Sequence, residues 1–337
     1  MKAELITSMG NDLLVVNAAR VSMDKESSYD EHHDDHDGFT TSMKGSDKRL
    51  LSYLARESHW TPFSHVRETF LMGSSSVHRQ YIDENMSMGL VIDAYDDGTT
   101  KMRHSLWGWA AILKRGCLTS DVSEHIAITL GRLYPECWKA MGMSTPEVVN
   151  RDTRIRHRSI EDEEDPRFID ITMRETVPIF VARQRFKHMV GFTYNEVSRR
   201  YVDTPPEFYT PDVWRSRPEG SIKQGSGDKE VTRLVDEDEY GCRYSNTTSN
   251  EYQEYLGAAG HLYNLILKNG VAPEQARMVL PQSMYTSYYV TGSLAAWARA
   301  YKQRSDDHSQ LEIQDLAVQW DSIIAPLFPE SWGVLTQ

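Results

Sequence analysis

Residues 182–201 are the stretch that most restricts what this chain can fold into. They place four arginines, a lysine, a histidine, two side-chain amides and a carboxylate within twenty positions. So many hydrogen-bonding groups rarely serve packing alone. Arginine presents a planar fork of donors that fits phosphate, while amides and hydroxyls read the edge of a heterocycle. The stretch therefore predicts a binding site for a phosphorylated ligand that carries a ring.

The composition is that of a globular protein. The chain has 337 residues, of which 39% are hydrophobic, enough for one large core or two ordinary ones. It has no apolar run long enough to span a membrane, and residues 1–6 lack the layout of a signal peptide. We therefore expect a cytoplasmic protein that does not engage a membrane. The cysteines are too few and too scattered for a disulfide framework or a zinc site: Cys117, Cys137 and Cys242.

The charge pattern argues against binding to a nucleic acid polymer. A formal net charge of −12 opposes the clustered lysine and arginine that such binding needs. The acidic runs at 161–165 and 236–239 are expected to be solvated loops. Residues 30–37 mix histidines with carboxylates, which are both metal ligands, but adjacent residues on a loop converge poorly on one ion. We expect a solvated loop there and assign no metal site.

Hydrophobic spacing predicts several regular elements. A helix is expected over 47–57 with Asp47 as its N-cap, and another over 250–268 followed by Gly270. If a helix continued through Arg304 and His308, these two side chains would share a face. The other predicted elements are a helical stretch over 123–141 interrupted at Pro135, strands over 67–72, 173–180 and 285–291, and a final helix from Leu311.

Several ordered blocks resemble those of flavin-dependent thymidylate synthases, the family also called thymidylate synthase complementing proteins. The turn His59-Trp-Thr-Pro-Phe-Ser-His65 is one block, and its two histidines are candidate ligand contacts. Thr193-Tyr-Asn-Glu-Val-Ser-Arg-Arg-Tyr201 resembles the second half of the family signature. The remaining blocks are Gly10–Leu13 with Ala18–Ser22, Arg277–Pro281, Tyr285–Thr286, Arg304 and His308–Ile313.

The resemblance implies a fold and a reaction. The fold would be α+β, a mixed sheet flanked by helices, as one domain over 1–337 with an insertion at about 73–173, assembled as a homotetramer with shared sites. The enzyme would be a methyltransferase that converts dUMP to dTMP, with methylenetetrahydrofolate as carbon donor, FAD as hydride carrier and NADPH as reductant. No enzyme nucleophile is obligatory in that scheme, and Cys137, in Pro-Glu-Cys-Trp, has no nucleophile setting.

The resemblance also implies site residues. Arg200 and Arg277 match arginines that grip the phosphate, and Arg304 matches one beside the pyrimidine, where a fixed charge stabilises developing negative charge. Arg304 and Ser198 are the implied catalytic pair. The nucleotide-binding set is Gln184, Glu196, Ser198, Arg200, Arg277 and Arg304. The FAD-binding set is Ser22, His59, Thr61, Lys187, His188, Arg299 and His308.

The flavin side of the signature departs from the family. Lys187 and Met189 stand where the signature has arginines, and Ala295 offers no polar contact. Arg299 is expected to restore part of the lost charge. These departures keep two alternatives open: a pyrimidine nucleotide 5-hydroxymethylase that uses the same folate pocket, and a nucleotide-binding relative without catalysis.

Overall fold

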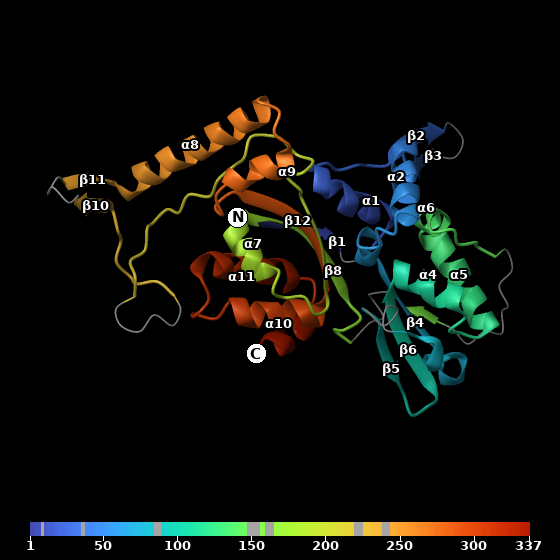
Figure 1. Ribbon diagram of the computed structural model, residues 1–337. Helices are drawn as coiled ribbons and strands as arrows, with labels where there is room; N and C mark the ends of the chain where they lie inside the picture. Colours follow the sequence, from blue (N-terminus) through green and yellow to red (C-terminus); the bar gives the residue numbers. More distant parts are fainter. Residues whose placement is uncertain are drawn as a thin grey trace.

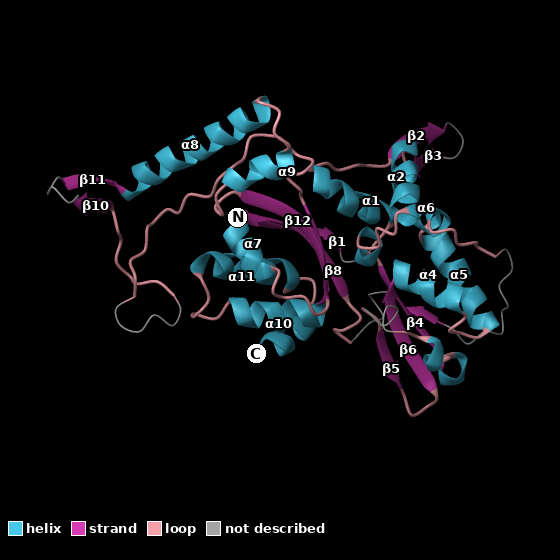
Figure 2. Cartoon of the chain, in the orientation of Figure 1, coloured by secondary structure: helices cyan, strands magenta, loops and turns pink. Residues whose placement is uncertain are grey.

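The computed structural model describes residues 1–7, 10–34, 38–83, 89–146, 156–158, 165–218, 225–237 and 243–337. Within these ranges two four-stranded sheets organise the chain (Figure 1, Figure 2). The first has the order β1 (Lys2–Thr7), β8 (Asp170–Pro178), β12 (Tyr285–Ser293) and β9 (Phe192–Glu196). The second has the order β5 (Val91–Ala94), β6 (Thr99–Ser105), β4 (Arg67–Gly73) and β7 (Arg156–Arg158).

The α+β class is confirmed, but the sheets are not mixed. In the described residues β8 runs antiparallel to both β1 and β12, and β4 runs antiparallel to both β6 and β7. The pairs β12–β9 and β5–β6 are antiparallel as well. The antiparallel arrangement holds for strands that are close in sequence, such as β5 and β6, and for strands far apart, such as β1 and β8. The expectation of a mixed sheet was therefore wrong.

The first sheet is covered by helices from the C-terminal part of the chain. These are α7 (Ile179–Arg185), α10 (Leu294–Arg304), α11 (Leu311–Ile324) and α12 (Pro329–Thr336). Trp297 of α10 and Trp320 of α11 meet edge to face, with ring centroids 5.5 Å apart, and both are fully buried. The predicted apolar stripe of α11 is confirmed, because Ile313, Leu316 and Trp320 all lie in this core.

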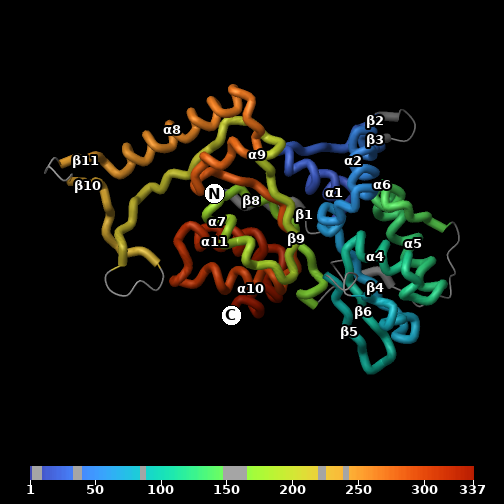
Figure 3. Tube along the Cα trace, in the orientation of Figure 1, coloured from blue at the N-terminus to red at the C-terminus, as the bar shows by residue number. Residues whose placement is uncertain are grey.

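The second sheet shares one core with helices that precede β4 in the sequence and helices that follow it. These are α1 (Asp12–Arg20), α2 (Gly45–Arg56), α4 (Leu106–Arg115), α5 (Ser120–Leu133) and α6 (Pro135–Ala140). Leu51 and Phe63 pack in the same cluster as Trp109 and Trp138, all fully buried. Helices α4, α5 and α6 thus belong to the same core as α1 and α2, and Figure 3 shows these helices on one side of the molecule.

One local expectation was wrong, and the condition attached to another is not met. Helix α2 begins at Gly45 with Lys44 as N-cap, because the buried Asp47 carboxylate instead accepts hydrogen bonds from Arg20 Nε at 3.0 Å and Ser27 Oγ at 2.6 Å. A buried carboxylate needs a cationic partner more than a helix end needs a cap. Helix α10 ends at Arg304, so His308 lies beyond the helix and shares no helical face with it.

The other helix and strand expectations are confirmed within a few residues. Helix α8 (Thr248–Lys268) starts where Thr247 Oγ1 accepts the Asn250 amide at 3.2 Å, and Gly270 follows its end with φ of 84°. The break between α5 and α6 falls at Pro135. The remaining described strands form two hairpins, β2 (Asp30–Asp34) with β3 (Gly38–Ser42) and β10 (Arg233–Glu237) with β11 (Arg243–Thr247). The remaining described α-helix is the short α9 (Pro273–Ala276).

Some expectations fall wholly or partly outside the described residues. Residues 30–34 form a strand rather than the expected loop, and 35–37 lie outside the description. Asp236 and Glu237, expected in a loop, instead end strand β10. The rest of that acidic run, 238–239, lies outside the description, as do 161–164 and Cys242. In the part of the chain that is described, no helix is long and apolar enough to cross a bilayer. No group of three metal-ligating side chains occurs in those residues either.

Candidate functional site

One cavity of about 600 Å³ gathers most of the residues expected to bind the nucleotide. It lies beside β8, β9 and β12, and the segment that follows β9 forms part of its wall. Ser198, Arg200, Arg277 and Glu196 line it together. Ser22, expected on the flavin side, lines it too. The fold therefore brings five of the expected ligand contacts together from three distant parts of the sequence.

Tight turns present Arg200 and Arg277, two of the four arginines that line the cavity. The Ser198 amide donates to Ser22 O at 3.0 Å, and the Tyr201 amide returns to Ser198 O at 2.9 Å, so the chain turns at Arg200. Arg277 begins a 3-10 turn directly after α9, and its Nε donates to Glu274 O at 3.2 Å. Both side chains are exposed, and neither forms an ion pair within the described residues. Their guanidinium groups keep free N–H donors that an anion in the cavity would accept.

Acidic and hydroxyl groups complete the cavity wall. Glu196, the last residue of β9, accepts a hydrogen bond from Thr286 Oγ1 at 2.7 Å. Partial burial of this carboxyl raises its pKa, although the residue keeps access to solvent. Arg174 of β8 was missed by sequence reasoning; it donates to Ser287 Oγ at 3.0 Å and pairs with Glu26 at 2.8 Å. Strand alternation was the available signal, since it sets Arg174 and Thr176 on one face of β8.

A second group of expected site residues surrounds Arg304 and does not line this cavity. Arg304 Nε donates to His188 Nε2 at 2.8 Å, and Arg304 Nη2 donates to Gln184 O at 3.1 Å. The His188 ring must therefore be neutral, with Nε2 as an acceptor. Burial, together with the neighbouring charge of Arg185, lowers the pKa of His188 to about 4. Within one chain, Gln184, His188 and Arg304 form a unit separate from Arg200 and Arg277.

Arg185 is part of the core rather than a donor for a ligand. It is fully buried, pairs with Glu175 at 3.2 Å, and donates to Tyr194 Oη at 2.6 Å. Its guanidinium lies 4.4 Å from the ring centroid of Phe192 and 4.7 Å from that of Trp297. One of the four arginines in 182–201 therefore serves packing. The dense run of donors was not wholly directed at a ligand.

The remaining residues expected on the flavin side lie in three places. Lys187 and Arg299 are exposed at the turn between α7 and β9, where Arg299 donates to Val190 O. His59 is exposed and Thr61 half-buried beside the 3-10 turn that precedes β4. His308 is exposed in the turn after α10. One chain by itself does not bring these side chains into a single pocket.

Two other side chains with reactive groups are structural. His65 is buried, with its ring nitrogens 2.7 Å from Thr291 Oγ1 and 3.2 Å from Asn195 Oδ1, so it joins strands rather than contacting a ligand. Cys137 is buried as well, and desolvation beside Asp12 raises the pKa of its thiol. A buried thiol of raised pKa is not a nucleophile, which agrees with the expectation from its sequence setting.

Comparisons with known proteins identify the family of this chain and several relatives. The family model described as thymidylate synthase complementing protein matches residues 4–88 and 149–330. The flavin-dependent thymidylate synthase of Thermosipho africanus (strain TCF52B) is 33% identical over 195 residues, which cover 56% of this chain and 75% of that relative. The flavin-dependent thymidylate synthase of Aquifex aeolicus (strain VF5) is 27% identical over 331 residues and covers 92% of both chains.

A solved structure also aligns along almost the whole chain. It is the UMP/dUMP methylase PolB from Streptomyces cacaoi bound with 5-Br UMP, at 20% identity and a TM-score of 0.40, covering 99% of this chain and 93% of its own. A likeness of this size carries no argument about ligands.

The fold and these matches define an α+β enzyme of the methyltransferase class. The chain belongs to the thymidylate synthase complementing protein family. The resemblance read from its sequence blocks is thereby confirmed. The segment that the family model leaves unmatched, 89–148, is shorter than the insertion expected at 73–173. It contains β5, β6, α4, α5 and α6.

Proposed function

We propose that this enzyme transfers a methyl group to dUMP and forms dTMP, with methylenetetrahydrofolate as carbon donor, FAD as hydride carrier and NADPH as reductant. The observation that carries the proposal is the cavity in which Ser198, Arg200 and Arg277 converge. Membership of the family and relatives named flavin-dependent thymidylate synthase support it. The reaction would take place in the cytoplasm, in a single domain that includes the insertion.

In this proposal the cavity binds the nucleotide. Two exposed guanidinium groups on one cavity wall suit a phosphate, because each offers parallel N–H donors to two of its oxygens. Glu196 accepts a hydrogen bond from Thr286, and its carboxyl oxygens can accept another from a sugar hydroxyl or a ring N–H. Ser198 contributes a hydroxyl from the same turn. The acidic net charge of the chain does not oppose this binding, since the cationic groups are local.

The turn between α7 and β9 has a donor set that fits a flavin. Lys187 and Arg299 supply exposed cations for its phosphates, and His188 supplies a neutral ring. Met189 and Val190 are 74% and 75% exposed and offer apolar contact for a planar ring system. When bound, the flavin would supply the hydride. Residues proposed to hold it are Ser22, His59, Thr61, Lys187, His188, Arg299 and His308.

Arg304 would stabilise negative charge that develops on the pyrimidine oxygens. Its guanidinium is already held by His188 and Gln184, so no reorganisation is needed when the charge develops. Because Arg304 and Gln184 do not line the nucleotide cavity of their own chain, we propose that they complete the cavity of another subunit. The enzyme would then be a homotetramer with shared sites.

A product assay tests the proposal. The purified protein is examined for the visible absorbance of bound flavin and then incubated with dUMP, methylenetetrahydrofolate and NADPH, and the product is identified by mass. Thymidylate is the expected product. A 5-hydroxymethyl product would replace the proposal by the hydroxymethylase alternative. Tight dUMP binding without turnover would favour the relative without catalysis. Omitting NADPH, and separately omitting the folate, shows which of the two the reaction requires.

A further inference from the structure

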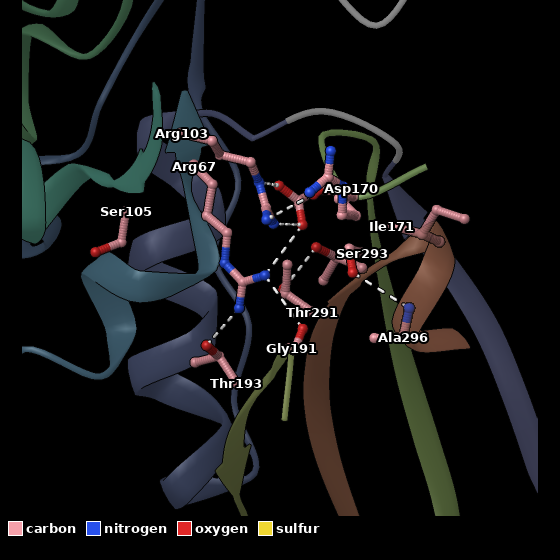
Figure 4. A network of polar contacts seen from close by, with 12 residues as sticks. Arg67, Arg103, Ser105, Asp170, Ile171, Gly191, Thr193, Thr291, Ser293 and Ala296 are labelled. Atoms are coloured by element: carbon pink, nitrogen blue, oxygen red, sulfur yellow. Dashed lines mark hydrogen bonds and ion pairs between the residues drawn. The ribbon is translucent and has the colours of Figure 1, made fainter. Parts of the chain in front are cut away.

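A buried cluster of three charged side chains joins the two sheets. It lies beside the turn between α7 and β9, residues 186–191, which is proposed to bind the flavin. Asp170, the first residue of β8, lies between Arg67 of β4 and Arg103 of β6 (Figure 4). Their side chains are only 16%, 9% and 4% exposed, respectively. Arg103 comes from the segment 89–148 that the family model leaves unmatched. A residue of the insertion thus reaches the part of the molecule that the family shares.

Arg103 occupies both oxygens of the Asp170 carboxylate. Its Nε donates to Oδ2 at 2.8 Å, its Nη2 donates to Oδ1, and its Nη1 donates to Arg167 O at 2.8 Å. This fork fixes the plane of the carboxylate, because two parallel N–H groups define its orientation. Arg67 approaches Oδ1 from outside this fork, with a single nitrogen, Nη1.

Arg67 reaches the turn between α7 and β9 with its two Nη atoms, while its Nε donates to Ser64 O at 3.3 Å. Its Nη1 is shared between Asp170 Oδ1 at 3.1 Å and Gly191 O at 3.3 Å, and its Nη2 donates to Thr193 Oγ1 at 2.8 Å. The turn lies close to α10 and requires glycine: Gly191 has φ of 83°, and a Cβ there would lie 2.8 Å from Ala296 Cβ. Figure 4 shows these contacts converging on Arg67.

We propose that Arg103 is a positioning residue for the turn between α7 and β9. Without Arg103, the Asp170 carboxylate would be free to rotate and bind two nitrogens of Arg67, which would draw that guanidinium away from Gly191 and Thr193. A residue of the insertion would thereby help to position the flavin site. That site lacks two arginines of the family signature, because Lys187 and Met189 stand in their places. The ligand of the turn rests on the proposed function; the positioning of the turn does not.

The test uses the full-length protein and the variant Arg103→Met, which keeps the side-chain stem and removes the fork. Amide hydrogen exchange of peptides covering 187–195 is measured without ligand, and dissociation constants are measured separately for FAD and for dUMP. We expect faster exchange in these peptides. FAD should bind about tenfold more weakly, the scale seen when groups that orient metal ligands are removed. dUMP should bind within about twofold of the wild type. A merely structural loss would weaken both ligands alike. Arg103→Lys, which keeps the charge but loses the fork, should recover only part of the FAD affinity.

Asp93→Asn is the matched control. It breaks another ion pair of the insertion, with Arg167, without touching Asp170 or Gly191. It should leave exchange of 187–195 unchanged. The same exchange in Arg103→Met as in the wild type would overturn the inference, whatever happens to FAD.

A second variant keeps the inference testable if Arg103→Met does not fold. Thr193→Val removes only the hydroxyl that accepts from Arg67, and it should raise exchange in the same peptide and weaken FAD but not dUMP. Wild-type exchange in this variant would count against the inference as well. A wild-type protein that binds no FAD would instead refute the proposed function, and the exchange data would still decide the positioning.

Discussion

The arginines of this chain show that one residue type serves opposite purposes. Arg200 and Arg277 stay exposed on a cavity wall, whereas Arg185 is buried in an ion pair among aromatic rings. The difference lies in what faces each guanidinium. Glu175 faces Arg185 across the core, and no carboxylate pairs with Arg200 or Arg277 among the described residues. A guanidinium that forms no salt bridge within the protein remains available to an external anion.

Replacing Arg277 with methionine should raise the dissociation constant for dUMP by about 10- to 100-fold, because a hydrogen bond to a charged group contributes about 1.5–3 kcal/mol. Isothermal titration calorimetry measures the change. Arg233→Met is a control: this exposed arginine of β10 contacts Ser245 and does not line the cavity. Affinity within twofold of the wild type for Arg277→Met would remove this residue from the phosphate site.

His188 should make stability depend on pH on the acidic side. Its pKa in the folded protein, about 4, lies below the ordinary value of 6.5, so the unfolded chain binds more protons between these values. The stabilising effect of the neutral ring is complete above pH 6.5 and is lost as the pH falls toward 4. His65, whose pKa burial lowers to about 3, adds to the same trend. Urea unfolding at several pH values should show a shallower decline for His188→Gln than for the wild type. An equal decline would mean that His188 does not titrate in this way.

At the scale of elements, the turn between α7 and β9 is held from both sides. Tyr194 of β9 accepts from Arg185 Nη1 and donates to His188 O, both at 2.6 Å. Arg67 holds the same turn through Gly191 and Thr193. The sequence of this turn departs from the family signature, but hydrogen bonds from neighbouring elements fix its position. The His188 amide also donates to Arg185 O at 3.1 Å, so the end of α7 and this hydrogen-bond network together set the position of His188.

Tyr194→Phe should lower the free energy of unfolding by about 1–3 kcal/mol, the cost of leaving a buried donor without its acceptor. Chemical denaturation followed by fluorescence measures it. Tyr244→Phe serves as control, because that hydroxyl is on the exposed strand β11 and contacts Glu251. If both variants unfolded at the same denaturant concentration as the wild type, the Tyr194 hydroxyl would have no role in holding the turn.

At the scale of the whole molecule, the separation of Arg304 from the nucleotide cavity has a direct consequence. If each site takes Arg277 from one subunit and Arg304 from another, two inactive variants should complement each other. Arg277→Met and Arg304→Met, mixed in equal amounts and allowed to exchange subunits, should restore about a quarter of the sites, since each site draws its two residues independently. Activity of the mixture relative to each variant alone measures this. A mixture as inactive as its components would place the complete site within one subunit.

Much of this protein was predictable from sequence, because periodic apolar residues and local motifs specify elements without reference to distant residues. Helices α8 and α11, the break at Pro135 and strand β12 were all expected. So was the family, through blocks that keep their order.

Only the tertiary structure decided which polar side chains face a ligand and which face each other. Asp47 was expected to cap a helix and His65 to contact a ligand, and Arg185 belongs to the stretch expected to bind one. Each is instead buried against a partner distant in sequence or against aromatic rings. The Arg67–Asp170–Arg103 cluster left no local signal either, since its members come from three separate strands. The spacing of apolar residues along a chain indicates whether a segment is a helix or a strand. Long-range packing, by contrast, decides which group pairs with a buried charged side chain, and the free energy of burying that side chain depends on the pairing.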